Sequence, residues 1–417
     1  MPSPRRHASR INTSRVSRRR AVKVAGLGAA TLAVAPHLRQ GVAAAPQNAT
    51  PTTTTAMSFS AADQVRFLTI VHDGLAATVT PGALVGVWSA SHGNWTYGAG
   101  IGDLRTAVPV SLDDHVRIAS NTKTFVATVV LQLVGEGALS LEDTLETYIA
   151  DIPNGGEITI RQLLAMDAGI YDYVREPVIA IDYAADPTIA FTPDDALAII
   201  RASTPDFAPG EELRYSNSNY VLLGFIIEQV TGQSVESEIE TRILTPLGLR
   251  QTSFPRTSAM PEPYAHGYLD KTIDGALQDV SISNPDVGWA AGAMVSTLED
   301  MHVWVRALAT GALLSPKVQR ERLMVRSIPN PTLEYGYGLG ILQVNGLLGH
   351  NGGIAGYSSW MMHDPETDTS VVVVAMRGGE QGGTADPIFF GLAHVLFPDR
   401  FPDLAKNAAT PAATPAP

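Results

Sequence analysis

A serine and a lysine three residues apart, Ser120 and Lys123, are the residues of this chain best placed to do chemistry. They lie between a strand-like segment, Val116–Ala119, and an apolar segment, Thr124–Val134, that is typical of a buried helix. In a helical first turn this spacing puts both side chains on one face. Because a serine hydroxyl becomes an effective nucleophile when a neighbouring base takes its proton, the pair predicts nucleophilic catalysis by Ser120.

Lys123 is an unusual residue for the start of an apolar helix. Its positive charge opposes the helix macrodipole, and burying an ammonium group without partners is unfavourable. The chain has five lysines, and only Lys123 follows a serine by three positions. The alternative interpretation is an ordinary first turn, with Ser120 as N-cap and Lys123 extending to solvent. Local conflicts of this kind occur mainly where function requires them.

A second polar cluster, Tyr215-Ser216-Asn217, precedes a predicted helix over Tyr220–Thr231. Beside a cation such as Lys123 the pKa of Tyr215 is expected to fall, which would favour the phenolate as a base. Asn217 offers both a donor and an acceptor, either for orienting a substrate amide or for holding the lysine. The alternative interpretation is a loop that caps the helix, with Tyr215 packed on the core.

A third cluster, Gly349-His350-Asn351-Gly352-Gly353, enters a strand-rich region. Glycines in a strand allow close approach of a substrate backbone, and they leave main-chain N–H groups free to act as oxyanion donors. Alone the pattern is weak, because His72-Asp73-Gly74 has the same His-x-Gly spacing. That earlier segment falls inside a predicted helix and indicates a surface or core histidine.

Composition and charge narrow the classes of protein that fit. Of the 417 residues, 45% are hydrophobic and 17% are charged, as in ordinary globular proteins. There is no cysteine, which excludes disulfides, thiolate metal sites and a cysteine nucleophile. Residues 1–45 hold nine basic residues and no acidic one, so 20 basic and 41 acidic residues remain, a charge of −21. Such an acidic surface repels nucleic acids and anionic membranes, so no nucleic-acid partner is expected.

Residues 1–45 have the layout of a secretory signal. The basic segment Ser17–Lys23 is followed by the apolar run Val24–Ala35, too short to span a bilayer, and then by small residues, Gly41–Ala45. A serine before Arg18-Arg19 and a lysine four residues after the pair resemble a twin-arginine signal. A basic nucleic-acid arm is the alternative, although it needs no apolar core. We expect an exported mature protein without an integral membrane segment; its oligomeric state is left open.

The spacing of apolar residues predicts an α+β domain over 58–404, after a Pro/Thr-rich linker over 46–57 and before a disordered tail over 405–417. We expect an antiparallel sheet from about 58–140 and 284–404, flanked by helices, and a mainly helical insertion over about 141–283. The predicted helices are Ala61–Thr78, Ile160–Met166, Pro193–Ala202, Tyr220–Thr231, Val235–Ile243 and Asp386–Leu396; the predicted strands include Leu84–Ala90, Trp95–Gly100, Gly340–Val344, Tyr357–His363 and Thr369–Met376.

The order Ser-x-x-Lys, Tyr-x-Asn, His-x-Gly at positions 120, 215 and 350 resembles the serine β-lactamase and penicillin-binding-protein superfamily, and the chain is similar to class C β-lactamases and D-alanyl-D-alanine carboxypeptidases. The resemblance covers nearly the whole folded part. It includes Thr159–Leu164, Pro246–Leu249, Gly288–Gly292, Ser296–Asp300 and Tyr337–Gly340.

This resemblance implies a β-lactamase/transpeptidase-like fold and an acyl-enzyme on Ser120, formed from a small-molecule or peptide substrate without a cofactor or metal. Lys123 and Tyr215 would share the role of general base, and which of the two takes the proton is left open. Asn217 would contact the substrate amide, and His350 would supply polarity beside Tyr215. The resemblance also implies substrate contacts by Asn351, Gly352 and Gly353, with an oxyanion hole formed by the N–H groups of Ser120 and Gly353.

The chain departs from the family pattern where a substrate carboxylate would bind. Asn351 replaces the usual Thr or Ser, Gly353 replaces a hydroxyl residue of the carboxypeptidases, and Ile341–Leu348 contains no basic residue. A missing charge-assisted contact removes roughly 1.5–3 kcal/mol. A peripheral difference is Met166-Asp167-Ala168-Gly169 in place of His-Thr-Ser-Gly. We therefore expect esters or other uncharged acyl donors to be preferred over D-Ala-D-Ala peptides and β-lactams.

Other functions fit the sequence less well. A non-catalytic penicillin-binding or acyl-accepting sensor of the same fold would need the same motifs and differ only in slow deacylation. An α/β-hydrolase lacks support, because the chain has no Gly-x-Ser-x-Gly segment. A metalloenzyme is disfavoured because there is neither a His-Glu-x-x-His segment nor a cysteine ligand.

Overall fold

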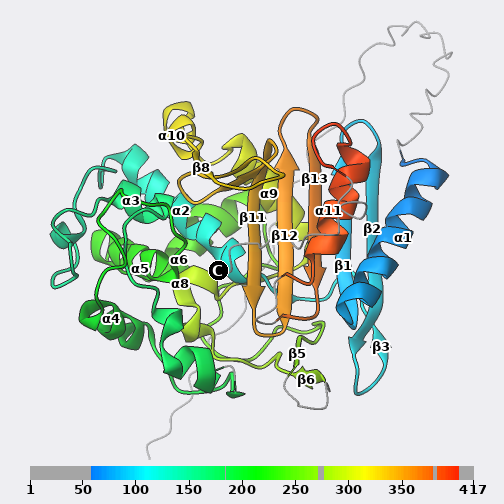
Figure 1. The fold of residues 1–417 in the computed structure, drawn as a ribbon, viewed down its shortest axis with the longest axis horizontal. Coiled ribbons are helices and arrows are strands. Elements are labelled where there is room, and N and C mark those ends of the chain that lie inside the picture. The colour runs from blue at the N-terminus through cyan, green and yellow to red at the C-terminus, as the bar shows by residue number, and fades with distance from the viewer. Residues whose placement is uncertain (1–57, 184, 271–276, 379–382, 403–417) are drawn as a thin grey trace, which may run out of the picture. The chain divides into compact units, whose positions relative to one another are not determined.

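The computed structural model describes residues 58–183, 185–270, 277–378 and 383–402 (Figure 1). The predicted signal over 1–45, the linker over 46–57 and the tail over 405–417 lie outside the described residues. In the described part of the chain, no helix combines the length and the apolar character needed to cross a membrane.

One antiparallel sheet of nine strands holds the domain together, in the order β3-β2-β1-β13-β12-β11-β10-β9-β8 (Figure 1). Its central strands are buried on both faces, which explains why β13 reads as an unbroken apolar run, Val371–Ala375. The strands are β1 (Gly82–Ser89), β2 (Gly93–Asp103), β3 (Val108–Pro109), β8 (Arg326–Ile328), β9 (Tyr335–Tyr337), β10 (Leu342–Val344), β11 (Leu347–Ile354), β12 (Tyr357–Asp364) and β13 (Thr369–Ala375).

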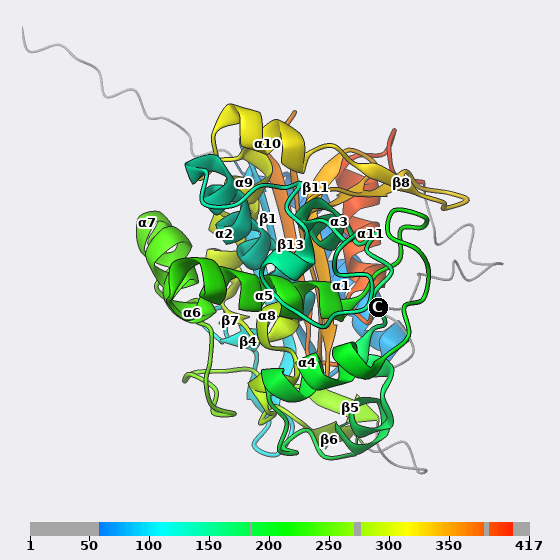
Figure 2. The ribbon, with the colours of Figure 1, turned by 90° about the vertical axis from the view of Figure 1, so that its left-hand side faces the viewer.

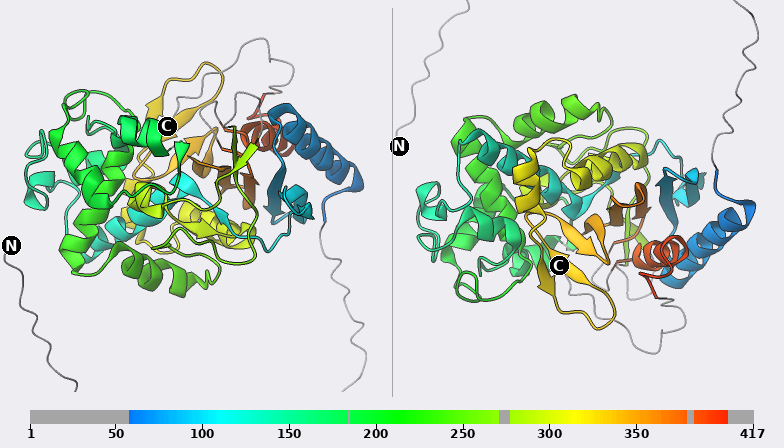
Figure 3. Two further views of the ribbon diagram at one scale, coloured as in Figure 1. Left: turned by 90° about the horizontal axis from the view of Figure 1, so that it is seen from below. Right: turned by 90° about the horizontal axis from the view of Figure 1, so that it is seen from above.

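Helices cover both faces of this sheet (Figures 1 and 3). On one face α1 (Ala61–Thr78) packs against α11 (Asp386–Leu396), and on the other face α9 (Leu298–Thr310) crosses the central strands. Local sequence sets where these helices begin: the Ser60 hydroxyl caps α1, the Thr297 hydroxyl caps α9, and a proline occupies the first turn of α11.

The helical part lies beside the β11 side of the sheet (Figures 1 and 2). Its centre is α2 (Thr122–Glu136), which packs against α5 (Asn217–Thr231) and α8 (Trp289–Gly292). The other helices and turns are η1 (Ala119–Asn121), η2 (Leu145–Thr147), α3 (Ile160–Ala165), η3 (Tyr173–Arg175), η4 (Val178–Tyr183), α4 (Pro193–Ala202), α6 (Val235–Ile239), η5 (Glu240–Leu244), α7 (Thr245–Leu247), η6 (Pro285–Val287) and α10 (Pro316–Arg322). Two small antiparallel sheets of two strands each complete it: β4 (Val116–Arg117) with β7 (Val295–Ser296), and β5 (Tyr268–Asp270) with β6 (Leu277–Asp279).

The predicted α+β class and its antiparallel sheet are confirmed. Two local predictions need correction. The strand predicted over Val116–Ala119 ends at Arg117, because Ala119 adopts a left-handed conformation with φ of 51° and turns the chain into η1. The single helix predicted over Val235–Ile243 is divided, since α6 continues into the π-helical turn η5.

Candidate active site

Ser120 sits on a sharp turn between a strand and a helix. Ala119, the residue before it, has φ of 51°, a conformation that a residue with a Cβ rarely adopts and that is often found at functional sites. The strand before the turn is anchored on the buried Arg117, whose guanidinium donates to the main-chain carbonyls of Ser258, Ser281 and Ser283. The turn thus presents Ser120 from a fixed backbone.

Lys123 is fully buried in the first turn of α2 and points at the serine. Its Nζ donates to Ser120 Oγ at 3.1 Å, to Asn217 Oδ1 at 2.7 Å and to the Ala291 carbonyl at 2.7 Å. Nζ also lies 4.8 Å from the centre of the Tyr215 ring. The three acceptors satisfy the three N–H groups of an ammonium, so the alternative of a lysine extending to solvent is wrong.

Burial shifts the pKa values of the two candidate bases in opposite directions. It lowers the pKa of Lys123 to about 7, with the charge of Asp172 opposing the change. Burial raises the pKa of Tyr215 above its ordinary value, and the neighbouring Ser120 hydroxyl only partly offsets this. The expectation that Lys123 would lower the pKa of Tyr215 is therefore wrong, because desolvation of the phenolate outweighs a lysine that is itself half neutral near pH 7.

Strand β11 forms the edge of the site opposite the helices. Its pairing with β10 ends at Gly349, while β11 itself continues to Ile354 and remains paired with β12. Gly352 lies tightly against the turn that carries Ser120: a Cβ there would come within 2.5 Å of the Ile118 carbonyl oxygen. At Gly353 a Cβ would meet no atom within 4 Å. The first glycine is needed for packing, and the second leaves an open stretch of backbone.

His350 is buried on β11 and is hydrogen-bonded at both ring nitrogens. Nδ1 lies 2.5 Å from the Asn351 carbonyl oxygen, and Nε2 lies 3.0 Å from the Tyr337 hydroxyl. Burial lowers the pKa of His350 to about 3, with the nearby Lys123 acting in the same direction and the Asn351 carbonyl opposing it. The imidazole is therefore neutral at physiological pH and supplies polarity without positive charge.

A cavity of about 200 Å³ joins these groups. It is bordered by Ser120, Tyr215, His350, Asn351, Gly352 and Gly353, so six of the eight predicted site residues meet there. The other two, Lys123 and Asn217, do not line the cavity. Lys123 contacts the lining residue Ser120, and Asn217 contacts Lys123. The Asn217 Oδ1 accepts from Lys123, and its Nδ2 donates to Asp172 at 3.1 Å.

The rest of this cavity is mostly apolar. Its remaining lining residues are Met166, Leu213, Arg214, Ile328, Tyr335, Tyr337 and Leu342. Among the described residues that line the cavity, Arg214 is the one that carries a positive charge. It is paired with Glu212 at 2.7 Å and with Asp206 at 3.6 Å. Of the residues described here, none that lines the cavity is a carboxylate.

Several of these residues carry no direct signal in the sequence. The apolar wall comes from five separate segments that only the folded chain brings together, and Ala291 contributes a carbonyl rather than a side chain. Asp172 lies between two tyrosines before η3, and an acidic residue in a loop is too common to indicate a site. Its 6% exposure is what distinguishes it.

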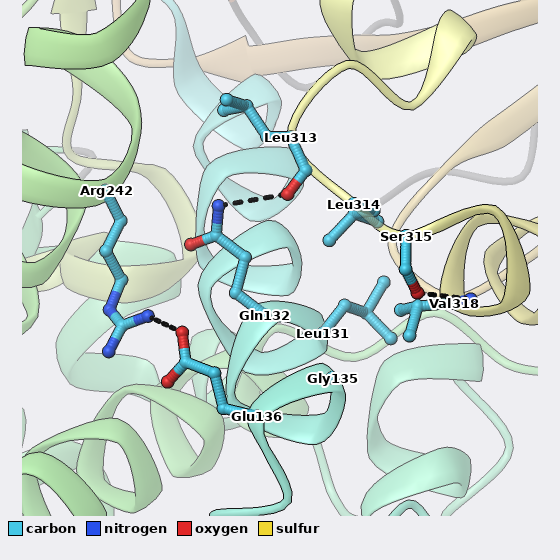
Figure 4. A pocket seen from close by; sticks show the side chains of 9 residues that line it. All are labelled: Leu131, Gln132, Gly135, Glu136, Arg242, Leu313, Leu314, Ser315 and Val318. Atoms are coloured by element: carbon cyan, nitrogen blue, oxygen red, sulfur yellow. Dashed lines mark hydrogen bonds and ion pairs between the residues drawn. The ribbon is translucent and has the colours of Figure 1, made fainter.

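A second cavity, of about 320 Å³, lies against the C-terminal half of α2 (Figure 4). There the Gln132 amide donates to the Leu313 carbonyl, and Arg242 pairs with Glu136 across one side (Figure 4). None of the predicted site residues borders it. The candidate active site is therefore the cavity at Ser120.

Comparison with known proteins agrees with this geometry. The family model described as Beta-lactamase matches residues 27–392. A D-aminopeptidase from Brucella anthropi is 28% identical over 320 residues, which are 74% of this chain and 58% of that protein. The chain thus spans about three fifths of the length of the curated relatives that it matches.

Two solved structures share the fold over most of their length. A D-stereospecific amidohydrolase from Streptomyces sp. is 34% identical with a TM-score of 0.68, over 77% of this chain and 97% of that one. A D-amino acid amidase from Ochrobactrum anthropi SV3 is 26% identical with a TM-score of 0.70, over 83% of this chain and 99% of that one. With its Ser-x-x-Lys turn, its fold and its family match in agreement, the chain belongs to the beta-lactamase family of serine hydrolases.

Proposed function

We propose that this protein hydrolyses an uncharged amide or ester through an acyl-enzyme on Ser120. The observation that carries the proposal is the buried Lys123, whose Nζ lies 3.1 Å from Ser120 Oγ and whose pKa is lowered to about 7. A lysine with an ordinary pKa near 10.5 would be protonated at neutral pH and could not accept a proton. This one is available as a base.

In acylation, neutral Lys123 takes the hydroxyl proton of Ser120 while Oγ attacks the substrate carbonyl carbon. The main-chain N–H groups of Ser120 and Gly353 would stabilise the oxyanion. As the bond to the leaving group breaks, the Tyr215 hydroxyl gives its proton to the departing nitrogen or oxygen and receives the proton held by Lys123. A tyrosine with a raised pKa suits this role, because it stays protonated and can donate.

Deacylation repeats these steps with water. After the leaving group departs, Lys123 is neutral again and takes a proton from a water molecule, which attacks the acyl ester. The proton then returns to Ser120 Oγ as the acid is released. Slow attack by water would instead give the acyl-accepting sensor, with the same acylation step.

The cavity supports a neutral substrate with an apolar group. His350 is uncharged, Arg214 is already paired with acidic side chains, and the remaining wall consists of Met, Leu, Ile and Tyr residues. A substrate carboxylate would find no unpaired cation in the described lining. The relatives named above are described as a D-aminopeptidase, a D-amino acid amidase and a D-stereospecific amidohydrolase, which favours an acyl group of D configuration.

The experiment compares four substrates on the wild type and on Ser120→Ala: a neutral aryl ester, N-acetyl-D-phenylalanine amide, a D-Ala-D-Ala peptide and a chromogenic β-lactam. We expect turnover of the ester or the amide that is abolished in Ser120→Ala. Full activity of the variant on the best substrate would refute the proposal. A burst of product without further turnover would instead indicate the acyl-accepting sensor.

We also propose that the protein is exported, on the strength of the paired arginines and apolar run in residues 1–45. Replacing both Arg18 and Arg19 by lysine keeps the charge of the segment. In a host with twin-arginine transport, the double variant should accumulate in the cytoplasm while the wild type is recovered outside it. Equal export of both proteins would contradict the proposal.

A further inference from the structure

Asp172 is a buried carboxylate that is linked to Lys123 through the Asn217 amide. It lies in the loop before η3, is 6% exposed, and accepts from Asn217 Nδ2 at 3.1 Å and from the Val174 main-chain N–H at 3.4 Å. We propose that Asp172 is a positioning residue, whose carboxylate fixes the Asn217 amide with Oδ1 toward Lys123 and places a negative charge behind that lysine. The inference rests on the proposed function, in which Lys123 is the base.

The loop that carries Asp172 is held firmly on the start of α5. The Ser218 hydroxyl donates to the Tyr171 carbonyl at 2.7 Å, and the Tyr173 N–H donates to the same hydroxyl at 3.0 Å. The main-chain N–H of Asn217 adds a hydrogen bond to the Asp172 carboxylate. An anion at a helix N-terminus is favoured by the macrodipole and by unpaired N–H groups. This attachment explains how a buried carboxylate is tolerated here.

The Asn217 amide has one orientation that satisfies both neighbours. Lys123 can only donate, so it needs the amide oxygen, while an ionised carboxylate can only accept, so it needs the amide nitrogen. The distances of 2.7 Å from Lys123 Nζ to Oδ1 and 3.1 Å from Nδ2 to Asp172 match this arrangement. Without the carboxylate the amide is free to rotate and present its NH₂ group to Lys123, which would disturb the aim of the lysine at Ser120.

The negative charge also acts on the proton affinity of Lys123. Burial raises the pKa of the Asp172 carboxylate, and the N–H groups of Asn217 and Val174 that donate to it, together with the nearby Lys123, oppose this rise and favour its ionised form. The other titratable groups that face this pair are neutral at physiological pH: Tyr173, Tyr215, Tyr220 and His350. Asp172 is therefore the charge in the described surroundings that favours the protonated lysine, and it opposes the effect of burial.

The test is a direct titration of Lys123 in the wild type, Asp172→Asn and a control, Asp167→Asn. The full chain has five lysines, so protein labelled with ¹³C at lysine Cε gives few signals, and the signal missing from Lys123→Met is assigned to Lys123. Asp167 lies five residues from Asp172, on the same segment, but is paired with Arg326 at 3.1 Å. Its replacement removes a carboxylate of that segment without touching the lysine.

We expect the Lys123 signal of Asp172→Asn to titrate roughly one pH unit below that of the wild type, and the control to match the wild type. The acid limb of kcat/KM should move the same way. Coincident Lys123 titrations in Asp172→Asn and the wild type would overturn the inference. Because the titration needs no substrate, that failure is distinct from failure of Ser120 to be acylated, which would overturn the proposed function.

A second variant covers the case in which Asp172→Asn does not fold. Asp172→Glu keeps the charge but displaces it by one methylene, so the Lys123 titration should stay close to that of the wild type while kcat falls by about tenfold or more as the Asn217 amide loses its alignment. A Lys123 titration far below that of the wild type, or an unchanged kcat, would contradict the positioning role.

Discussion

The Tyr337 hydroxyl lies 3.0 Å from His350 Nε2 and, together with the Asn351 carbonyl at Nδ1, fixes the tautomer of the histidine. The Asn351 carbonyl at Nδ1 can only accept a hydrogen bond, so Nδ1 carries the proton. Nε2 is then the acceptor, and the tyrosine donates. A neutral His350 with its lone pair occupied offers a substrate carboxylate no charge, which is the basis for expecting uncharged substrates.

Tyr337→Phe should destabilise the protein and weaken catalysis together. The change leaves Nε2 of a buried histidine without a donor, which costs about 1–3 kcal/mol of unfolding free energy. Urea denaturation measures this loss. Tyr335→Phe is the matched control for stability: it removes a hydroxyl from the same strand without contacting His350, so its effect should stay below about 1 kcal/mol. Equal losses in the two variants would contradict the account.

The pH dependence of kcat/KM should report Lys123. Below its pKa of about 7 the lysine is protonated and cannot accept the Ser120 proton, so kcat/KM should rise as pH increases through 7. Tyr215 has a raised pKa and His350 titrates near 3, so neither should produce a limb between pH 5 and 9. Initial rates on a neutral ester across that range test this. A loss of activity on going from pH 7 to 9 would count against Lys123 as the base.

The two glycines of β11 should respond differently to alanine. In Gly352→Ala the new Cβ meets the Ile118 carbonyl at 2.5 Å and Ser359 Oγ at 2.7 Å, so the turn that bears Ser120 must move. We expect a loss of about 1–3 kcal/mol in unfolding free energy together with most of the activity.

In Gly353→Ala the Cβ has open space, so stability should remain within about 0.5 kcal/mol of the wild type. The methyl group narrows the cavity that Gly353 borders, so KM for a bulky substrate should rise more than KM for a small ester. Thermal denaturation and steady-state kinetics of both variants separate the two effects. The comparison fails if Gly353→Ala is the less stable of the pair.

Substrate charge should decide turnover. The described lining contains no carboxylate for an α-ammonium and no unpaired cation for a carboxylate. N-acetyl-D-phenylalanine amide should therefore be hydrolysed with a higher kcat/KM than N-acetyl-D-phenylalanyl-D-alanine, by about tenfold or more for a lost charge-assisted contact. A preference for the peptide with a free carboxylate would contradict the neutral-substrate account.

Much of the fold follows from local pattern. Helical spacing of apolar residues predicts Ala61–Thr78 and Asp386–Leu396 with the bounds that the structure has, and α4 matches its predicted range, Pro193–Ala202. The turn at Ala119 was missed because the left-handed conformation of an alanine is imposed by tertiary contacts rather than by its own preference. The β5–β6 hairpin has strands of three residues, too short to carry an alternating pattern.

The candidate site, like the fold, could be predicted from the sequence only in part. Ser120, Lys123 and Tyr215 are recognisable from residue type and spacing, and the structure brings them together. The protonation states depend on burial, which residue spacing does not reveal. The predicted decrease in the pKa of Tyr215 is therefore wrong, because burial raises it. Asp172 acts through Asn217 from a separate loop, and such a contact across 45 residues exists only in the folded chain.

Acylation of Ser120 can be measured by mass spectrometry of the quenched protein. The full-length protein is mixed with a neutral aryl ester, quenched in acid within seconds and digested to locate the added mass. We expect one acyl group on the peptide that contains Ser120 in the wild type and none on that peptide in Ser120→Ala. An acyl group on another residue, or substrate hydrolysis by Ser120→Ala at the wild-type rate, would contradict it.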